Sequence, residues 1–101
     1  MATTTKKELA QRIADETGLQ LADVTKAMQA FMDQIIEDLA SGKRIEFREF
    51  GVFETRRRKA RLARNPKTGE KVNIGARQIV AFKPGLVMKR RVQEAIGWMQ
   101  S

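Results

Sequence analysis

The spacing of hydrophobic residues in the first 40 positions predicts two amphipathic helices. Thr5 and Glu8 have the spacing of an N-terminal capping box, which indicates that a helix begins near Lys6. Apolar residues then recur at steps of three and four as far as Gly18, a residue that commonly ends helices. A second stripe with this spacing fills residues 21–40. Because only two or three residues join the two segments, we expect an antiparallel helical hairpin.

Beyond the second helix the hydrophobic period falls to two, which is typical of strands. Residues 44–48 alternate polar and apolar side chains, and a second strand starts at Val52 after a short turn. A third strand over 77–82 restores the apolar pattern before Pro84 and Gly85 break it. The sequence therefore predicts three strands.

Cations replace the apolar face between the second and third strands. Five of the six residues from Arg56 to Arg61 are Lys or Arg, and a strand with cations on both faces does not pack on a core. Residues 54–79 are therefore expected to project as a two-stranded β-ribbon, closed by a turn at 64–69.

Together these elements predict an α+β fold in one domain, residues 1–101. The expected order is an N-terminal helical hairpin, a three-stranded antiparallel sheet whose strands 2–3 extend as a β-ribbon arm, and a short C-terminal helix over 86 to about 96. In this interpretation residues 1–53 and 80–101 form the body, and residues 54–79 form the arm.

The charge of the chain is large and unevenly distributed. The 101 residues carry a formal net charge of +8, and residues 54–79 hold nine Lys or Arg against two Asp or Glu. Residues 1–53 hold seven against nine. This concentration of cations predicts a polyanionic partner, with nucleic acid as the first candidate and an acidic membrane as the second. The chain has no apolar run long enough for a membrane span or a secretory signal, so we expect a cytoplasmic location and no membrane partner.

The chain contains neither histidine nor cysteine. It therefore lacks the commonest general base, the commonest transition-metal ligand and the thiol nucleophile. Most of its Asp and Glu residues lie in the predicted helices, where they suggest no catalytic constellation. We expect no enzymatic activity, no metal and no cofactor, and a fold that does not depend on disulfides.

The cationic ribbon matches the geometry of a nucleic-acid strand. Alternate residues of a strand lie about 6–7 Å apart, close to the spacing of successive phosphates. Each Lys or Arg that neutralises a phosphate releases a counterion, so this binding would be salt-sensitive and tolerant of sequence.

The expected tip of the ribbon carries Pro66 among polar residues. A proline ring is rigid, apolar and without an N–H group, and such a ring can enter between base pairs and kink a duplex. Arg64 and Asn65 are placed to bond acceptors on the groove floor, and Lys67 to reach a phosphate. The alternative is that Pro66 only fixes the loop, but the cationic ribbon beneath it favours the wedge.

An RNA-binding or ribosome-associated basic protein is the alternative from a different class. The charge alone fits it. Readers of single-stranded RNA usually present stacking aromatic side chains, however, and this ribbon has none between Phe53 and Phe82. Preference for bent duplex over single strands or RNA hairpins would separate the two.

Three motifs in this order resemble the bacterial HU/IHF family of DNA-bending proteins. They are Phe-Gly-Val-Phe at 50–53, Arg-Asn-Pro-Lys-Thr-Gly at 64–69 and Ala-Phe-Lys-Pro-Gly at 81–85. The likeness extends from about residue 5 to about residue 95. It implies an intertwined dimer whose two β-ribbon arms enter the minor groove of double-stranded DNA, especially bent, nicked or flexible DNA.

The resemblance also implies roles for individual residues, with Pro66 as the intercalating wedge. With the tip residues included, the expected DNA-binding residues are Arg56, Arg58, Arg61, Arg64, Asn65, Pro66, Lys67, Lys71, Arg77, Lys6, Arg48, Lys83 and Lys89. The expected dimer core is Met28, Phe31, Met32, Ile35, Phe47, Phe50, Phe53 and Phe82.

The resembling family includes both sequence-tolerant and sequence-selective members. Arg44, Glu46 and Arg48 alternate along one strand, which resembles an IHF-like site where an acid holds an arginine for the minor groove. An exposed ion pair of this kind contributes only about 0–1 kcal/mol, so its presence decides little. We expect a sequence-tolerant, HU-like homodimer that compacts or organises the nucleoid, with an IHF-like selective protein and a heterodimer as the alternatives.

Some positions depart from the resembling family. Glu49 and Ala63 stand where the family often has glycine, so the turn and the arm are expected to differ there. The tail from Gly97 has no counterpart, and Trp98 is expected to pack on the body.

Overall fold

The computed structural model describes the backbone of residues 2–100 and the side chains of residues 2–97. The expected packing of Trp98 lies outside the described side chains. The chain divides into two compact units, residues 1–37 and residues 38–101.

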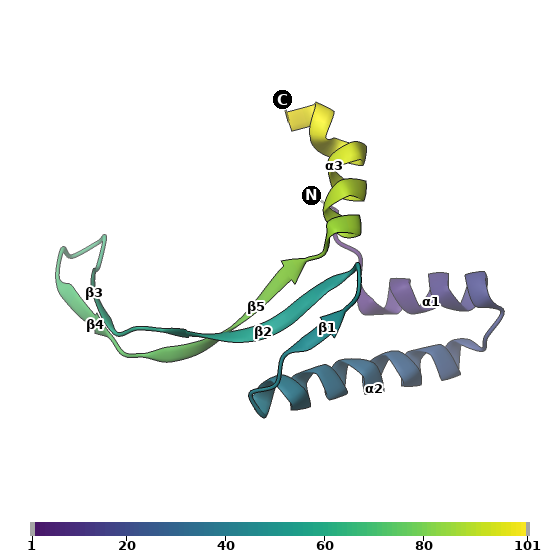
Figure 1. Ribbon diagram of the computed structural model, residues 1–101, viewed down its shortest axis with the longest axis horizontal. Helices are drawn as coiled ribbons and strands as arrows, with labels where there is room; N and C mark the ends of the chain where they lie inside the picture. The colour runs from purple at the N-terminus through teal and green to yellow at the C-terminus, as the bar shows by residue number, and fades with distance from the viewer. Residues whose placement is uncertain (1, 101) are drawn as a thin grey trace. The chain divides into compact units, whose positions relative to one another are not determined.

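The first unit is a helical hairpin, as the hydrophobic spacing predicted (Figure 1). Helix α1 covers Lys6–Thr17, and helix α2 covers Leu21–Ala40 and so runs on into the second unit. The Thr5 hydroxyl accepts a 3.2 Å hydrogen bond from the Glu8 N–H, which caps α1. Gly18 ends α1 at φ 77°, in the left-handed region that favours glycine.

The buried core of this first unit is small. It consists of Ala10, Ala14 and Val24, with Ile13 and Met28 packed against them. Larger apolar side chains on α2 remain accessible, since Phe31 is 53% exposed and Ile36 65% exposed. The hairpin alone therefore leaves much of its apolar surface in contact with water.

The second unit contains the predicted three-stranded antiparallel sheet. Strands β1 (Ile45–Phe47), β2 (Gly51–Arg58) and β5 (Arg77–Pro84) pair in the order β1-β2-β5. The register pairs Phe53 of β2 with both Ile45 and Phe82. Because residues paired across neighbouring strands point to the same side, these side chains share one face of the sheet.

Phenylalanine rings extend this face into a continuous cluster. The rings of Phe47, Phe50, Phe53 and Phe82 form four pairs with centroids 4.7 to 6.3 Å apart, two of them edge-on and two tilted. Phe50 is nevertheless 51% exposed. We refer to these four residues as the aromatic cluster.

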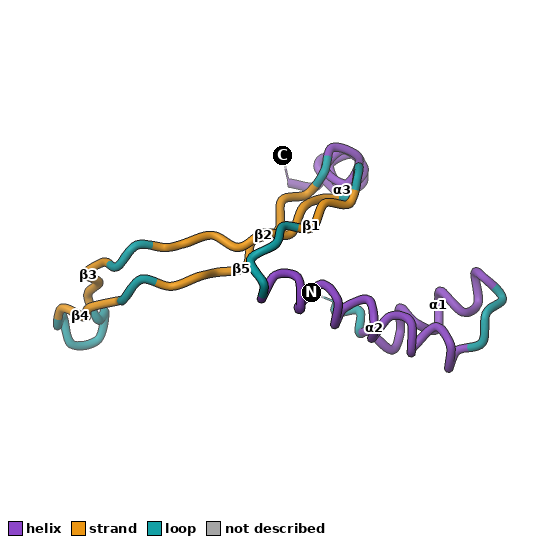
Figure 2. Tube along the Cα trace, turned by 60° about the horizontal axis from the view of Figure 1, so that its bottom comes forward, coloured by secondary structure: helices purple, strands orange, loops and turns teal. Residues whose placement is uncertain are grey.

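Within the predicted arm, residues 61–74 contain a second, separate pair of strands. Strands β3 (Arg61–Arg64) and β4 (Lys71–Ile74) pair antiparallel with each other. Figure 2 shows that this pair continues the ribbon that β2 and β5 begin. The sequence had suggested two continuous strands, but residues 59–60 and 75–76 interrupt them. Glycine and alanine at 75–76 offer almost no side chain to pack, which weakens a strand at that point.

The expectation that the arm lacks an apolar face needs a correction. The register places Ala63 opposite Val72 and Arg61 opposite Ile74, so one face of the β3–β4 pair is largely apolar. Leu62 pairs with Asn73 on the other face. The alternation of apolar and polar residues in β3 is hard to recognise in the sequence, because the strand is short and many cations surround it.

A hydrogen bond and an unusual backbone angle define the corner where β2 begins and β5 ends. The Gly85 N–H donates a 2.8 Å hydrogen bond to the Phe50 carbonyl. Glu49 adopts φ 70°, in the left-handed region where a side chain costs about 1–2 kcal/mol relative to glycine. Glu49, which stands where the resembling family often has glycine, thus adopts a backbone conformation that favours glycine.

Gly85→Ala is expected to lower the free energy of unfolding by about 1–3 kcal/mol. A Cβ at Gly85 would lie 2.6 Å from the Glu49 carbonyl oxygen and 2.8 Å from its carbon, and backbone atoms cannot easily yield. Urea denaturation measures the loss. Gly75→Ala is the matched control, because nothing lies within 4 Å of its added Cβ; equal stability of both variants would contradict the expectation.

The last helix is longer than the sequence predicted. Helix α3 covers Leu86–Gln100, whereas an end near residue 96 was expected from Gly97. A glycine within a helix costs only about 1 kcal/mol, and Gly97 has no positive φ, so it continues the helix instead of ending it.

Candidate nucleic-acid interface

The strand register brings four of the predicted DNA-binding cations onto one face. Arg56 pairs with Ile79, Arg58 pairs with Arg77, and Lys83 lies opposite Val52. Alternation places these four cations on the face of the β2–β5 pair opposite the aromatic cluster. All four side chains are exposed, so we refer to Arg56, Arg58, Arg77 and Lys83 as the cationic face. Arg57 lies on the other face, opposite Gln78.

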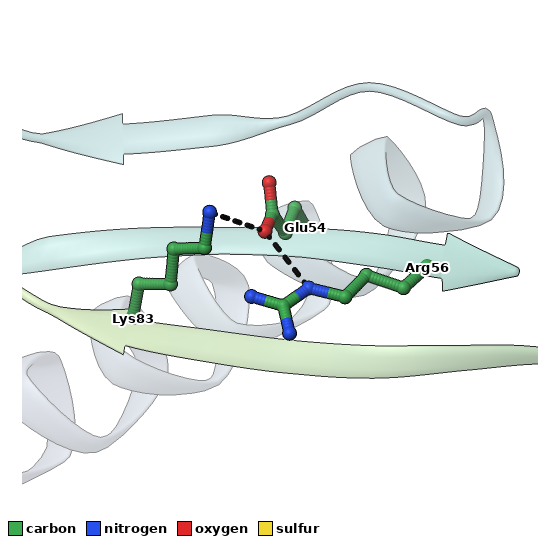
Figure 3. A network of polar contacts seen from close by, with 3 residues as sticks. All are labelled: Glu54, Arg56 and Lys83. Atoms are coloured by element: carbon green, nitrogen blue, oxygen red, sulfur yellow. Dashed lines mark hydrogen bonds and ion pairs between the residues drawn. The ribbon is translucent and has the colours of Figure 1, made fainter. Parts of the chain in front are cut away.

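The Glu54 carboxylate lies on the cationic face and contacts two of its cations. Its Oε1 atom accepts from Arg56 Nε at 3.1 Å and from Lys83 Nζ at 3.2 Å (Figure 3). The hydrogen bonds from Lys83 and Arg56 hold the pKa of the Glu54 carboxyl below its ordinary value. Glu54 is therefore ionised at neutral pH and partly neutralises the two cations.

The interruption between the two strand pairs forms a basic hollow. Its lining includes Arg58, Lys59, Arg61 and Arg77 around the apolar side chains of Ile74 and Ile79, and its volume is about 500 Å³. The break in the ribbon thus gathers cations from four separate sequence positions. Lys59 was not among the residues predicted to contact DNA.

The tip of the arm is a closed loop with Pro66 exposed. The Asn65 N–H donates to the Glu70 carbonyl, and the Gly69 N–H donates to the Asn65 carbonyl, both at 2.8 Å. The Asn65 Oδ1 atom also accepts a 2.9 Å hydrogen bond from the Lys67 N–H. Gly69 has φ 75°, which completes the turn. These bonds use the Asn65 side-chain oxygen as an acceptor, and the side-chain amide nitrogen of Asn65 carries two further N–H donors.

The remaining predicted residues occupy other places. Arg64 and Lys71 face each other across β3 and β4 beside the tip. Lys6 belongs to the first unit, where its Nζ donates to the Gln29 side chain. Arg48 lines a groove of about 430 Å³ beside Phe50 and α3, and Lys89 lines another of about 700 Å³ beside Phe82. Both of these residues are exposed.

Glu54 is the polar residue of this face that the sequence analysis missed. An acid two positions before an arginine on the same strand shares its face, and this spacing could have suggested the Arg56 contact. The Lys83 contact depends on the register of β2 and β5, which the sequence alone did not fix.

Comparison with known proteins gives the family. Residues 4–93 match the family described as bacterial DNA-binding protein. The chain belongs to the bacterial HU/IHF family. Its relatives include integration host factor subunit alpha of Xanthomonas campestris, 41% identical over 93 residues, which cover 92% of this chain and 94% of that protein.

Solved structures agree with this HU/IHF membership. HU of Anabaena in a cocrystal with DNA has a TM-score of 0.82 and 36% identity, over 88% of this chain and 97% of that chain. HU of Thermotoga maritima has a TM-score of 0.63 and 27% identity, over 88% and 98% respectively. The HU/IHF resemblance and the α+β fold predicted from the sequence are confirmed.

Membership in the HU/IHF family makes this chain an architectural DNA-binding protein, not an enzyme. Among the residues described, no helix has the length and apolar character needed to cross a membrane.

Proposed function

We propose that this HU/IHF-family chain clamps double-stranded DNA with its ribbon, bends the duplex with Pro66, and does so with little sequence specificity. It would act as a nucleoid-associated homodimer in the bacterial cytoplasm. The observation that carries the proposal is the register of β2 and β5, which puts Arg56, Arg58 and Arg77 on one exposed face leading toward an exposed proline.

The cationic face suits a row of phosphates. Arg56 and Arg58 are two residues apart on β2, about 6–7 Å at the rise of a strand. Contacts of this kind neutralise phosphates and release counterions without reading bases. They support affinity that tolerates sequence and falls steeply with salt.

The tip suits a wedge in the minor groove. Hydrogen bonds within residues 65–70 hold the loop closed, so the exposed Pro66 ring is presented on an ordered turn. An apolar ring inserted at a base step partly unstacks it and kinks the duplex. The side-chain amide nitrogen of Asn65 is a donor that suits the acceptors on the groove floor.

The exposed apolar surface supports a homodimer. Only Ala10, Ala14, Val24 and Leu39 are buried apolar residues among those described, and no large side chain is fully buried. The predicted dimer-core residues are all exposed or half-buried in the single chain. The two grooves beside α3 add further accessible apolar lining, and a second copy would cover such surfaces.

If the hydrophobic core forms between two copies of the chain, the stability of the folded protein will depend on protein concentration. We expect a sedimenting mass of about twice the 11.5 kDa chain, and a urea midpoint that rises with protein concentration. Sedimentation equilibrium and denaturation over a hundredfold concentration range measure both. A monomer with a concentration-independent midpoint would contradict the dimer.

The bending itself is tested by energy transfer between dyes at the two ends of a duplex. Saturating protein should raise the transfer efficiency, since a kink of tens of degrees shortens the end-to-end distance. Anisotropy of the same duplex reports binding independently. Saturated binding without any change in transfer would refute the bending.

Sequence-selective binding is the second candidate, and two observations favour it. The 41% identical relatives include proteins named integration host factor subunit alpha. Glu46 of β1 also lies opposite Val52, on the same side of the sheet as the cationic face, and Arg44 and Arg48 flank β1 in the sequence. Competition by a library of random duplexes decides, because enrichment of one sequence by 1,000-fold or more indicates specific binding and uniform competition indicates HU-like tolerance.

A further inference from the structure

Glu54 is an acid on a surface that is proposed to bind phosphates, where a negative charge should weaken DNA binding. Its Oε1 atom contacts Arg56 Nε and Lys83 Nζ at 3.1 and 3.2 Å, and its side chain is only 17% exposed. Both partners are among the cations that the proposed function assigns to DNA.

The geometry of the triad leaves most of the cationic donors unused. Figure 3 shows Arg56 reaching Glu54 through Nε, while its two terminal nitrogens lie beyond that contact. An arginine has five N–H donors and a lysine three, so one contact from each leaves four and two respectively. A phosphate could therefore be bound without displacing Glu54.

We propose that Glu54 is a positioning residue for DNA binding: it holds Arg56 and Lys83 over the same ribbon face with their remaining donors directed to phosphates. This inference rests on the proposed function. A long side chain that is already ordered loses less conformational freedom on binding, which is worth about threefold to tenfold in affinity for each side chain.

Simple electrostatics predicts the opposite sign. Removing one negative charge about 6 Å from a phosphate in water should raise affinity by about threefold or less. The direction of the change therefore distinguishes a residue that positions cations from one that only reduces their charge.

The test compares Glu54→Gln with Glu70→Gln. Both variants remove one acid from the 54–79 segment with little change in shape, but the Glu70 carboxylate forms no ion pair among the described residues. Anisotropy titration against a nicked duplex should show binding at least threefold weaker for Glu54→Gln, and unchanged or slightly tighter for Glu70→Gln. Unchanged or tighter binding by Glu54→Gln would overturn the proposal.

A double-mutant cycle assigns the effect to the two cations. Glu54→Gln should cause no loss when Arg56→Gln and Lys83→Gln are already present, because nothing remains to be positioned. A loss that persists in this background overturns the role. Glu54→Asp, which keeps the charge but shortens the side chain, should also weaken binding, and melting curves of each variant identify any loss that comes from unfolding.

Failure of this inference is distinguishable from failure of the proposed function. If Arg56→Gln and Lys83→Gln each weaken binding while Glu54→Gln strengthens it, only the positioning role is wrong. If Arg56→Gln, Lys83→Gln and Arg58→Ala all leave DNA affinity unchanged, the cationic face is not the footprint and both proposals are wrong.

Discussion

Pro66→Ala is expected to abolish more than half of the protein-induced bend while lowering DNA affinity by less than about fivefold. The proline is exposed and contributes no charge, so its loss leaves the phosphate contacts intact and removes only the apolar ring that unstacks a base step. End-to-end energy transfer at saturating protein measures the bend, and anisotropy measures the affinity.

Lys67→Ala is the matched control at the neighbouring tip position. It removes a charge and keeps the ring, so it should weaken binding and leave the bend of the saturated complex unchanged. Melting curves should be unaltered for both variants, because both side chains are exposed. An undiminished bend with Pro66→Ala would eliminate the wedge.

Arg58→Ala should reduce DNA affinity about fivefold to tenfold near 0.1 M salt. The loss of one phosphate contact lowers the magnitude of the slope of log K against log salt by about one. Arg58 lies on the cationic face opposite Arg77 and also lines the basic hollow, so it is placed to meet a phosphate. Titrations at four or more salt concentrations give the slope.

Arg57→Ala is the control that separates the effect of lying on the cationic face from the effect of losing one positive charge. It removes the same side chain from the next position of β2, but that position faces the opposite way and pairs with Gln78. Its salt slope should change by much less than one. Equal slopes for the two variants would mean that net charge, and not the register of the ribbon, governs binding.

Helices and body strands were predictable because their signals are local. Thr5 and Gly18 cap α1 as their positions in the sequence indicated, and the stripe over 21–40 matches α2 to the residue. The sheet followed from period-two alternation and from the glycines at its corners. Such patterns are readable in the sequence because the repeat of a helix or a strand is set by the geometry of that segment alone.

What the sequence did not reveal depends on pairing between distant residues. The contact of Glu54 with Lys83 exists only because β5 returns beside β2 in one register. Strand pairing stops at 59–60 on one side of the ribbon and at 75–76 on the other. The sequence of each segment, read separately, does not show this interruption. Gly97 does not end α3, because the common glycine cap of a helix requires a left-handed φ and Gly97 has no positive φ.

The roles of the individual DNA-binding and dimer-core residues stay predictions. The single chain shows that every predicted DNA-binding cation is exposed and that the predicted dimer core is incompletely buried. Both observations are compatible with the assigned roles, and the variants described above test them.

The most direct test of the central claim is a set of anisotropy titrations at several salt concentrations with four ligands. They are an intact random duplex, the same duplex with a nick or unpaired bases, single-stranded DNA and an RNA hairpin. A protein that bends DNA should bind the flexible duplex most tightly, because less free energy is then spent on deformation, and its affinity should fall steeply with salt. Equal affinity for all four ligands would mean that charge alone governs binding, and it would contradict the DNA-bending clamp.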